Sequence, residues 1–148
     1  MRWIALAPLA LLLACLPTVE HAEGDWGVNL DDALKAAAEN NRGVLLDFTG
    51  SDWCPPCQAL HRRVLNTRPF VDYADENLEL VLVDFPRRNP LPKKQAEANA
   101  ALAKRFNVNG FPVLLLLDAT GRERTRLDGY GGEEAEDVIR WLEKNRAK

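Results

Sequence analysis

The chain has 148 residues, of which 47% are hydrophobic and 28% charged, and its formal net charge at pH 7 is −3. This length is enough for one domain with an apolar core, and the composition is typical of a soluble globular protein. The slight net charge does not support nucleic-acid binding. Four basic residues gather at Arg87, Arg88, Lys93 and Lys94. We interpret them as a solvated loop rather than a phosphate site, because no Gly-rich loop accompanies them.

The beginning of the chain is typical of an export signal. Arg2 precedes an apolar run over Ile4–Leu16, which contains Pro8. The run is too short to span a bilayer, which takes about 20 residues, but it matches the hydrophobic region of a secretory signal. The proline also argues against a buried core helix. We therefore expect residues 1–22 to be an export segment with its linker, and residues 23–148 to form the folded domain.

Two cleavage sites fit this segment. Leu12-Leu13-Ala14-Cys15 resembles the lipobox of bacterial lipoproteins, in which the cysteine carries the lipid and becomes the new N-terminus. Cleavage after Ala22 is the alternative, but it puts Glu20 where a small residue is preferred. We favour the lipoprotein, with Cys15 as the lipidated residue and a lipid anchor that tethers the domain to a membrane.

Alternating strand and helix signals follow the export segment. The expected elements, in chain order, are a strand over Trp26–Asn29, a helix over Asp31–Asn40, a strand over Val44–Phe48, helical pieces over 54–65 and Phe70–Glu76, a strand over Leu78–Phe85, a helix over Lys93–Phe106, strands over Val113–Asp118 and Arg124–Asp128, and an amphipathic helix after Gly132. The helices are predicted from apolar residues at helical spacing, and the strands from short aliphatic runs. This order predicts an α/β fold with a mixed central sheet and helices on both faces.

One short motif carries most of the chemical information. Trp53-Cys54-Pro55-Pro56-Cys57 follows the expected strand Val44–Phe48. Cysteines at i and i+3 share one helical face and are close enough to form a disulfide. A thiol at the start of a helix lies at the positive end of the helix dipole, which lowers its pKa and favours the nucleophilic thiolate. The motif therefore predicts a redox-active dithiol, because a lone close pair in an oxidising compartment indicates catalysis rather than structural stapling.

The active-site strand and motif, together with a downstream proline segment, resemble the thioredoxin family. Val44–Phe48 followed by the cysteine motif is similar to the family's active-site strand and helix, and Phe106–Leu116 is similar to its cis-proline segment. The stretch Phe48–Cys54 resembles exported bacterial thioredoxin-like proteins rather than cytosolic ones. The resemblance extends from about Trp26 to the C-terminus. It implies a thioredoxin fold and a thiol–disulfide oxidoreductase that needs no cofactor beyond its dithiol.

The resemblance also implies a role for each site residue. Cys54, exposed at the helix start, would attack a substrate disulfide as a thiolate, and the more shielded Cys57 would resolve the mixed disulfide. Pro112 would follow a cis peptide bond and bring the Phe111 backbone beside Cys54, where an extended substrate segment can pair. The alternative for Pro112 is a proline that merely begins a strand. Trp53 would cover the rim of the site or, alternatively, pack in the core.

Two further residues are candidates near the cysteines. Asp47 interrupts an apolar strand, so burial would raise its pKa and make it a candidate acceptor for the Cys57 proton. The alternative is an acid paired with a neighbouring base or turned to the end of the sheet. His61 follows Cys57 by four residues and could complete a three-ligand metal site with the two thiolates. We favour an exposed helix residue at this position and expect no metal.

These patterns together predict an exported, periplasmic or extracytoplasmic thiol–disulfide oxidoreductase that is monomeric. Its partners would be protein thiol and disulfide substrates and a second protein that recycles the dithiol. The competing hypotheses are a metal-handling module built on Cys54, Cys57 and His61, and a peptide-binding adapter with little turnover. Pro55 and Pro56 bring no charge to the dithiol, so we expect a less oxidising pair than in the strongest oxidants; the net direction stays open.

Overall fold

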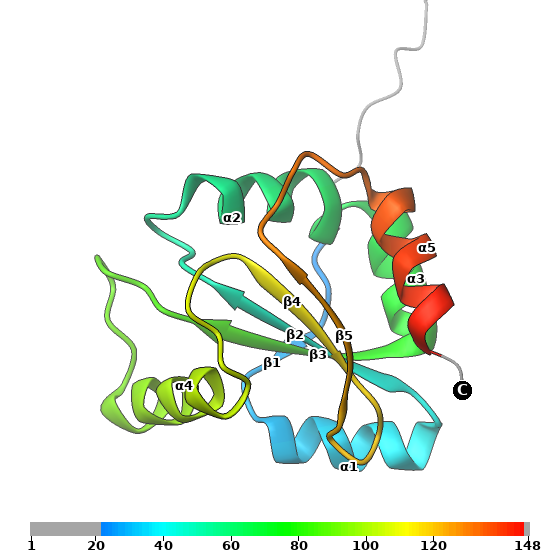
Figure 1. The fold of residues 1–148 in the computed structure, drawn as a ribbon, viewed down its shortest axis with the longest axis horizontal. Coiled ribbons are helices and arrows are strands. Elements are labelled where there is room, and N and C mark those ends of the chain that lie inside the picture. The colour runs from blue at the N-terminus through cyan, green and yellow to red at the C-terminus, as the bar shows by residue number, and fades with distance from the viewer. Residues whose placement is uncertain (1–21, 147–148) are drawn as a thin grey trace, which may run out of the picture.

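A five-stranded mixed sheet forms the centre of the computed structural model, which describes residues 22–146 (Figure 1). The strands are β1 (Trp26–Gly27), β2 (Gly43–Thr49), β3 (Leu78–Asp84), β4 (Val113–Leu117) and β5 (Glu123–Asp128). Their spatial order is β1-β3-β2-β4-β5, with β1, β3 and β2 parallel and β4 and β5 each antiparallel to its neighbours. The mixed sheet expected from the sequence is confirmed. The expected export segment, including Cys15, lies almost wholly outside the described residues.

Helices cover both faces of this sheet (Figure 1). The helical elements are α1 (Leu30–Asn40), α2 (Pro55–Leu60), the π-helical turn η1 (His61–Leu65), α3 (Arg68–Asn77), α4 (Lys93–Arg105) and α5 (Ala135–Arg146). Helices α1 and α4 lie on one face, and α2, η1, α3 and α5 lie on the other. Among the described helices, none is both long and apolar enough to cross a membrane.

The central strand β2 is buried over its whole length, as expected for a strand covered on both faces. Val44, Leu46 and Phe48 belong to the apolar cluster beneath α1 and α4, whereas Leu45 belongs to the cluster beneath α2, α3 and α5. Alternate side chains of a strand point to opposite faces. Asp47 therefore points to the same face as Leu45, toward the helix that carries the two cysteines.

The helix after the cysteine motif differs from the continuous α-helix expected through residue 65. After Leu60 the chain changes to π-helical bonding, and the backbone N–H of Asn66 donates to the carbonyl oxygen of His61, five residues earlier, at 2.8 Å. A π turn widens the helix locally, and such turns occur often at functional sites. The prediction of an α-helix is therefore wrong from His61 onward. Residue composition carries no strong signal that distinguishes π-helical from α-helical bonding.

Candidate active site

The two cysteines form a disulfide where β2 gives way to α2. Their Cα atoms are 5.3 Å apart, and the Cys54 sulfur accepts a hydrogen bond from the backbone N–H of Cys57 at 3.3 Å, so Cys54 is the N-cap of α2. Pro55 and Pro56 occupy the first turn, where a missing N–H donor costs little. The sequence predicted this pairing and its position at a helix start.

The expected exposure of Cys54 is wrong. Cys54 is 4% exposed and Cys57 is completely buried. The reason is the direction of the Cys54 side chain, which points back toward the first turn of α2 and is bonded there to the sulfur of Cys57. A substrate disulfide would therefore reach the Cys54 sulfur only by packing closely against the residues that surround Cys54.

The loop between β2 and the cysteines is fastened to the end of the neighbouring strand β3 and the segment after it. The Ser51 hydroxyl and backbone N–H both donate to the carboxylate of Asp84, at 2.6 and 2.9 Å. The carboxylate of Asp52 accepts hydrogen bonds from the backbone N–H groups of Arg87, Arg88 and Asn89. These contacts hold the loop in a defined conformation.

Trp53, Phe85 and Phe111 form an aromatic rim beside Cys54. The indole N–H of Trp53 donates to the carbonyl oxygen of Phe85 at 2.8 Å, and its ring lies edge-on to Phe111 with centroids 6.0 Å apart. Phe85 stacks on Phe111 at 4.9 Å. The peptide bond between Phe111 and Pro112 is cis, as the family resemblance implied, and Pro112 also directly precedes β4. Phe85 was not predicted as a site residue from the sequence. Its position at the end of an expected strand was the only indication that it lies at this edge of the sheet.

A buried carboxylate pairs with an imidazole near Cys57. Asp47 is completely buried, and its Oδ2 atom is 2.6 Å from Nε2 of His61, whose side chain is 25% exposed. The expectation that His61 is an exposed helix residue is therefore wrong, because the imidazole turns inward to reach the carboxylate on β2. Asp47 is both buried, as predicted, and paired with a base, which was the stated alternative. Within residues 22–146, no cluster of three His, Cys, Asp or Glu side chains is arranged to hold a metal ion.

The two partners of this pair shift in pKa for different reasons. Burial raises the pKa of Asp47, and the hydrogen bond and positive charge of His61 only partly oppose this effect. Burial alone would lower the pKa of His61, but the hydrogen bond and negative charge of Asp47, with a further contribution from Asp84, outweigh burial and raise it. Both groups therefore hold protons more tightly in the folded protein than in the unfolded chain.

A hollow of about 280 Å³ lies beside His61 and the second cysteine. It is lined by Thr49, Ser51, Cys57, Gln58, His61 and Arg62. The hydroxyl oxygen of Thr49 and the Oδ1 atom of Asp47 are buried and have no hydrogen-bond partner within the described part of the chain. Cys57 and His61 thus line a common hollow, and the carboxylate that binds the imidazole keeps one oxygen without a partner.

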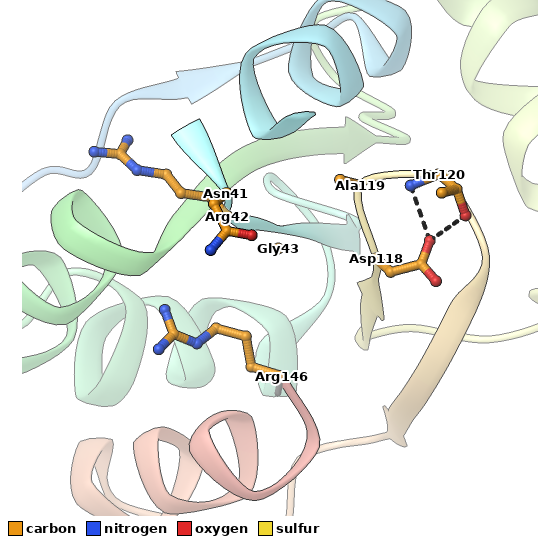
Figure 2. Close-up of a pocket in the computed structure, with 7 residues that line it drawn as sticks. All are labelled: Asn41, Arg42, Gly43, Asp118, Ala119, Thr120 and Arg146. Atoms are coloured by element: carbon orange, nitrogen blue, oxygen red, sulfur yellow. Dashed lines mark hydrogen bonds between the residues drawn. The ribbon is translucent and has the colours of Figure 1, made fainter. Parts of the chain in front are cut away.

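A second hollow, of about 460 Å³, lies at the opposite end of the sheet (Figure 2). Its polar side chains serve the local structure: Asp118 accepts hydrogen bonds from the backbone and hydroxyl of Thr120, as Figure 2 shows, and Arg42 forms a salt bridge with Glu79. None of the site residues expected from the sequence lines it. The chemistry of the molecule is therefore concentrated at the cysteine end.

Comparison with known proteins agrees with this site and fold. Residues 30–146 match the family model of the thioredoxin-like domain. The chain belongs to the thioredoxin-like family. Its relatives include the disulfide bond reductase DsbH of Chlamydia pneumoniae, which is 35% identical over 96 residues, covering 65% of this chain and 58% of that protein. The thioredoxin-related protein DsbJ of the same organism is 30% identical over 139 residues, covering 90% of this chain and 40% of that protein.

A solved structure of a DsbH oxidoreductase superposes with a TM-score of 0.75 at 30% identity, covering 88% of this chain and 90% of that one. The thioredoxin fold expected from the sequence is confirmed. The chain spans about half the length of the two Chlamydia relatives, 58% and 40%. Homology to disulfide oxidoreductases supports a thiol–disulfide oxidoreductase function for the cysteine pair of this thioredoxin-like domain.

Gly50 is required by the position of Trp53. A Cβ atom at residue 50 would lie 2.5 to 2.7 Å from three atoms of the indole ring. We expect Gly50→Ala to displace the indole from its hydrogen bond to Phe85 and to lower the free energy of unfolding by about 2 kcal/mol, the usual cost of overpacking. Gly110→Ala is the matched control in the same site, because a Cβ there would meet no atom within 4 Å. Urea titration of both variants measures the difference, and equal stabilities would contradict the close contact.

The Asp47–His61 pair should be visible in stability. We expect His61→Leu to lower the free energy of unfolding by about 3 kcal/mol, because it leaves a buried carboxyl without its partner. The double variant Asp47→Leu/His61→Leu should recover most of this loss, since apolar replacements of a whole buried pair are often neutral. Urea titration of the single and double variants tests this; equal losses in both would argue against an energetic pairing.

The same pair makes stability depend on pH. Because the folded pKa of His61 lies above its ordinary value, the folded state binds more protons, and stability falls as pH rises from about 6.5 through the folded pKa. The raised pKa of Asp47 acts in the same direction. The double variant should lack this decrease, which unfolding measurements at a series of pH values would detect.

Proposed function

We propose that the protein is a thiol–disulfide oxidoreductase that acts on disulfides of other proteins through Cys54 and Cys57. The observation that carries this proposal is the disulfide across the first turn of α2, with one sulfur serving as the helix N-cap. A thiolate at Cys54 would receive the backbone hydrogen bond that the Cys54 sulfur now accepts from Cys57, together with the positive end of the helical segment. Relatives that are named as a disulfide bond reductase and an oxidoreductase support the same activity.

The reaction follows from the two thiols. The Cys54 thiolate attacks one sulfur of a substrate disulfide, which forms a mixed disulfide and releases one substrate thiolate. Cys57 then loses its proton and attacks the Cys54 sulfur, which releases the second substrate thiol and leaves the Cys54–Cys57 disulfide. Two electrons pass from the protein to the substrate. During the first step an extended substrate segment would lie along the backbone at Phe111, next to the cis bond before Pro112.

The net direction that we propose is reduction. One relative that shares the family and the fold is named a disulfide bond reductase. Pro55 and Pro56 add no positive charge that would further stabilise the reduced, thiolate-bearing form. The pair should therefore be less oxidising than in the strongest oxidants of this fold, and a second protein would have to return electrons to it.

The compartment that we propose is extracytoplasmic. The observation behind it is the apolar run over Ile4–Leu16 after Arg2, followed by a lipobox-like stretch that ends in Cys15. In this proposal Cys15 carries a lipid, and the thioredoxin-like domain acts at a membrane surface as a monomer.

Redox equilibration tests the activity and its direction together. We expect the Cys54–Cys57 couple, equilibrated with a defined thiol couple and trapped by alkylation, to have a potential closer to about −270 mV than to about −120 mV. Cys54→Ser should abolish the reduction of a protein disulfide, whereas Cys57→Ser should accumulate the mixed disulfide. An adapter would keep its function in Cys54→Ser, and a metal-handling module would bind Cu or Zn in its reduced form and resist alkylation; either result would contradict the proposal.

Within this mechanism we propose that Asp47 and His61 accept the proton of Cys57. His61 lies one helical turn after Cys57, and both line the hollow of about 280 Å³. One oxygen of Asp47 binds the imidazole, while the other has no partner among residues 22–146. The raised pKa of the carboxyl brings it closer to that of a thiol, which favours proton transfer in the resolving step.

This relay predicts a pH-dependent defect. We expect Asp47→Asn to slow release of substrate from the mixed disulfide about 100-fold at pH 7, the lower end of the usual contribution of a general base. The defect should shrink above about pH 9, where the Cys57 thiol ionises without assistance. Single-turnover kinetics over pH 6–10 measures the step. A defect of the same size at every pH would instead mean that Asp47 only supports the structure.

A further inference from the structure

A basic loop lies directly beside the aromatic rim. Residues 85–92, which link β3 to α4, contain Arg87 and Arg88, and Lys93 and Lys94 follow at the start of α4; this stretch holds no carboxylate, although the whole chain carries a net charge of −3. Figure 1 shows this loop extending beyond the end of β3, on the same side of the molecule as the start of α2. Lys94 lines a hollow with Asp31 and Asp32 of α1, so it is Arg87 and Arg88 that bring positive charge next to the cysteine motif.

The conformation of the basic loop is fixed by Asp52, which lies two residues before Cys54. The Asp52 carboxylate accepts backbone N–H groups of Arg87 at 2.9 Å, Arg88 at 2.7 Å and Asn89 at 3.2 Å. These bonds, the one from Arg87 first, lower the pKa of Asp52 below its ordinary value. On the β3 side, the buried Asn99 donates to the carbonyl oxygen of Asp84 at 2.8 Å. The loop is therefore held in place beside the site.

The arginine side chains of this loop keep their charge available at the surface. The guanidinium of Arg87 lies 3.6 Å from the centre of the Trp53 ring, a cation–π contact that holds the positive charge over the residue before Cys54. Arg88 is exposed as well, and its guanidinium attracts Asp52 from a distance. Within the described chain neither arginine forms a salt bridge with a carboxylate, whereas Lys93 pairs with Glu97.

We propose that Arg87 and Arg88 dock an acidic segment of the partner protein, next to the cysteine that reacts with Cys54. This inference rests on the proposed function, because it assigns a substrate class to the same site. A strand advances about 3.3 Å per residue, so acidic side chains within a few residues of the reacting cysteine would reach Arg87 above Trp53. The arginines would steer such a partner to a thiol that is 4% exposed and therefore depends on close docking.

The position of the two arginines favours a protein segment over an anionic membrane as the occupant. Arg87 rests on the aromatic rim, and Phe111 of that rim precedes Pro112, where an extended segment would pair. A segment that reaches Cys54 along this rim therefore passes the guanidinium of Arg87.

Three synthetic peptide disulfides test the proposal. Each is a homodimer of one short peptide joined through a single cysteine, and the three differ only in flanking residues: Asp and Glu, Asn and Gln, or Lys. The fully reduced protein is mixed with each peptide, and its oxidation is followed by rapid alkylation and mass spectrometry. We expect the acidic peptide to react about tenfold faster than the neutral one at low ionic strength, and this advantage to vanish near 0.5 M salt.

The variant Arg87→Gln/Arg88→Gln should lose the preference for the acidic peptide and keep its rate with the neutral one. Arg124→Gln/Lys144→Gln is the matched control, because it removes two exposed charges at the opposite end of the sheet. The control should retain the preference. Thermal unfolding of both variants ensures that they are folded when they are compared.

The outcomes separate the inference from the proposed function. Failure to reduce any of the three peptides, with the dithiol intact, would contradict the proposed function itself. Reduction of all three at equal rates, or a preference that survives in Arg87→Gln/Arg88→Gln, would overturn the docking surface alone. Equal peptide rates combined with binding to phosphatidylglycerol vesicles that depends on these arginines would assign the basic loop to a membrane instead.

Discussion

The buried carboxylate of Asp47 is the constraint around which the cysteine end of the molecule is arranged. It lies on a strand with no exposed residue, and an unpaired charge there would be costly. His61 provides the partner, and it reaches Asp47 only because the helical segment after the cysteines lies directly over the end of β2. The hydrogen bond that neutralises the carboxylate therefore also fixes the position of Cys57, one turn earlier on the same segment. In the mechanism proposed above, stability and deprotonation of Cys57 depend on the same pair of side chains.

Much of this arrangement could be predicted from the sequence because it follows from local periodicity. The aliphatic run of β2 predicts burial on both faces, and strand alternation then determines that Asp47 shares a face with Leu45. Helical spacing likewise puts His61 on the side of Cys57. Periodicity does not predict which side chain of the helix will contact which side chain of the sheet, and so it did not pair His61 with Asp47. His61 therefore looked like a metal ligand or an exposed residue, although its actual partner was the acid already singled out.

The contacts around Cys54 were harder to predict because they join residues far apart in the chain. Asp52 and the arginines that it orients are separated by 35 and 36 positions, and Trp53 and Phe85 by 32. In the sequence, the stretch Phe48–Cys54 and the basic cluster after β3 were two unrelated features. They are connected only in the tertiary structure, where the carboxylate of Asp52 accepts hydrogen bonds from the backbone of the basic loop. The burial of Cys54 was equally hard to predict, because it depends on the direction of the Cys54 side chain within the folded turn.

The two sulfurs of the disulfide thus face different surroundings, and this asymmetry matches the two steps of thiol exchange. Cys54 adjoins the aromatic rim and the arginines, which in our proposal contact an incoming partner and which carry no group suited to accept a proton. Cys57 lines the open hollow that His61 also lines, and His61 in turn binds Asp47. In the proposed mechanism, selection of a partner and deprotonation of the resolving thiol therefore fall to separate sets of residues. Because the two sets share no side chain, changes in Arg87 should alter only formation of the mixed disulfide, and changes in Asp47 only its resolution. A family member could in this way change its substrates without changing its chemistry.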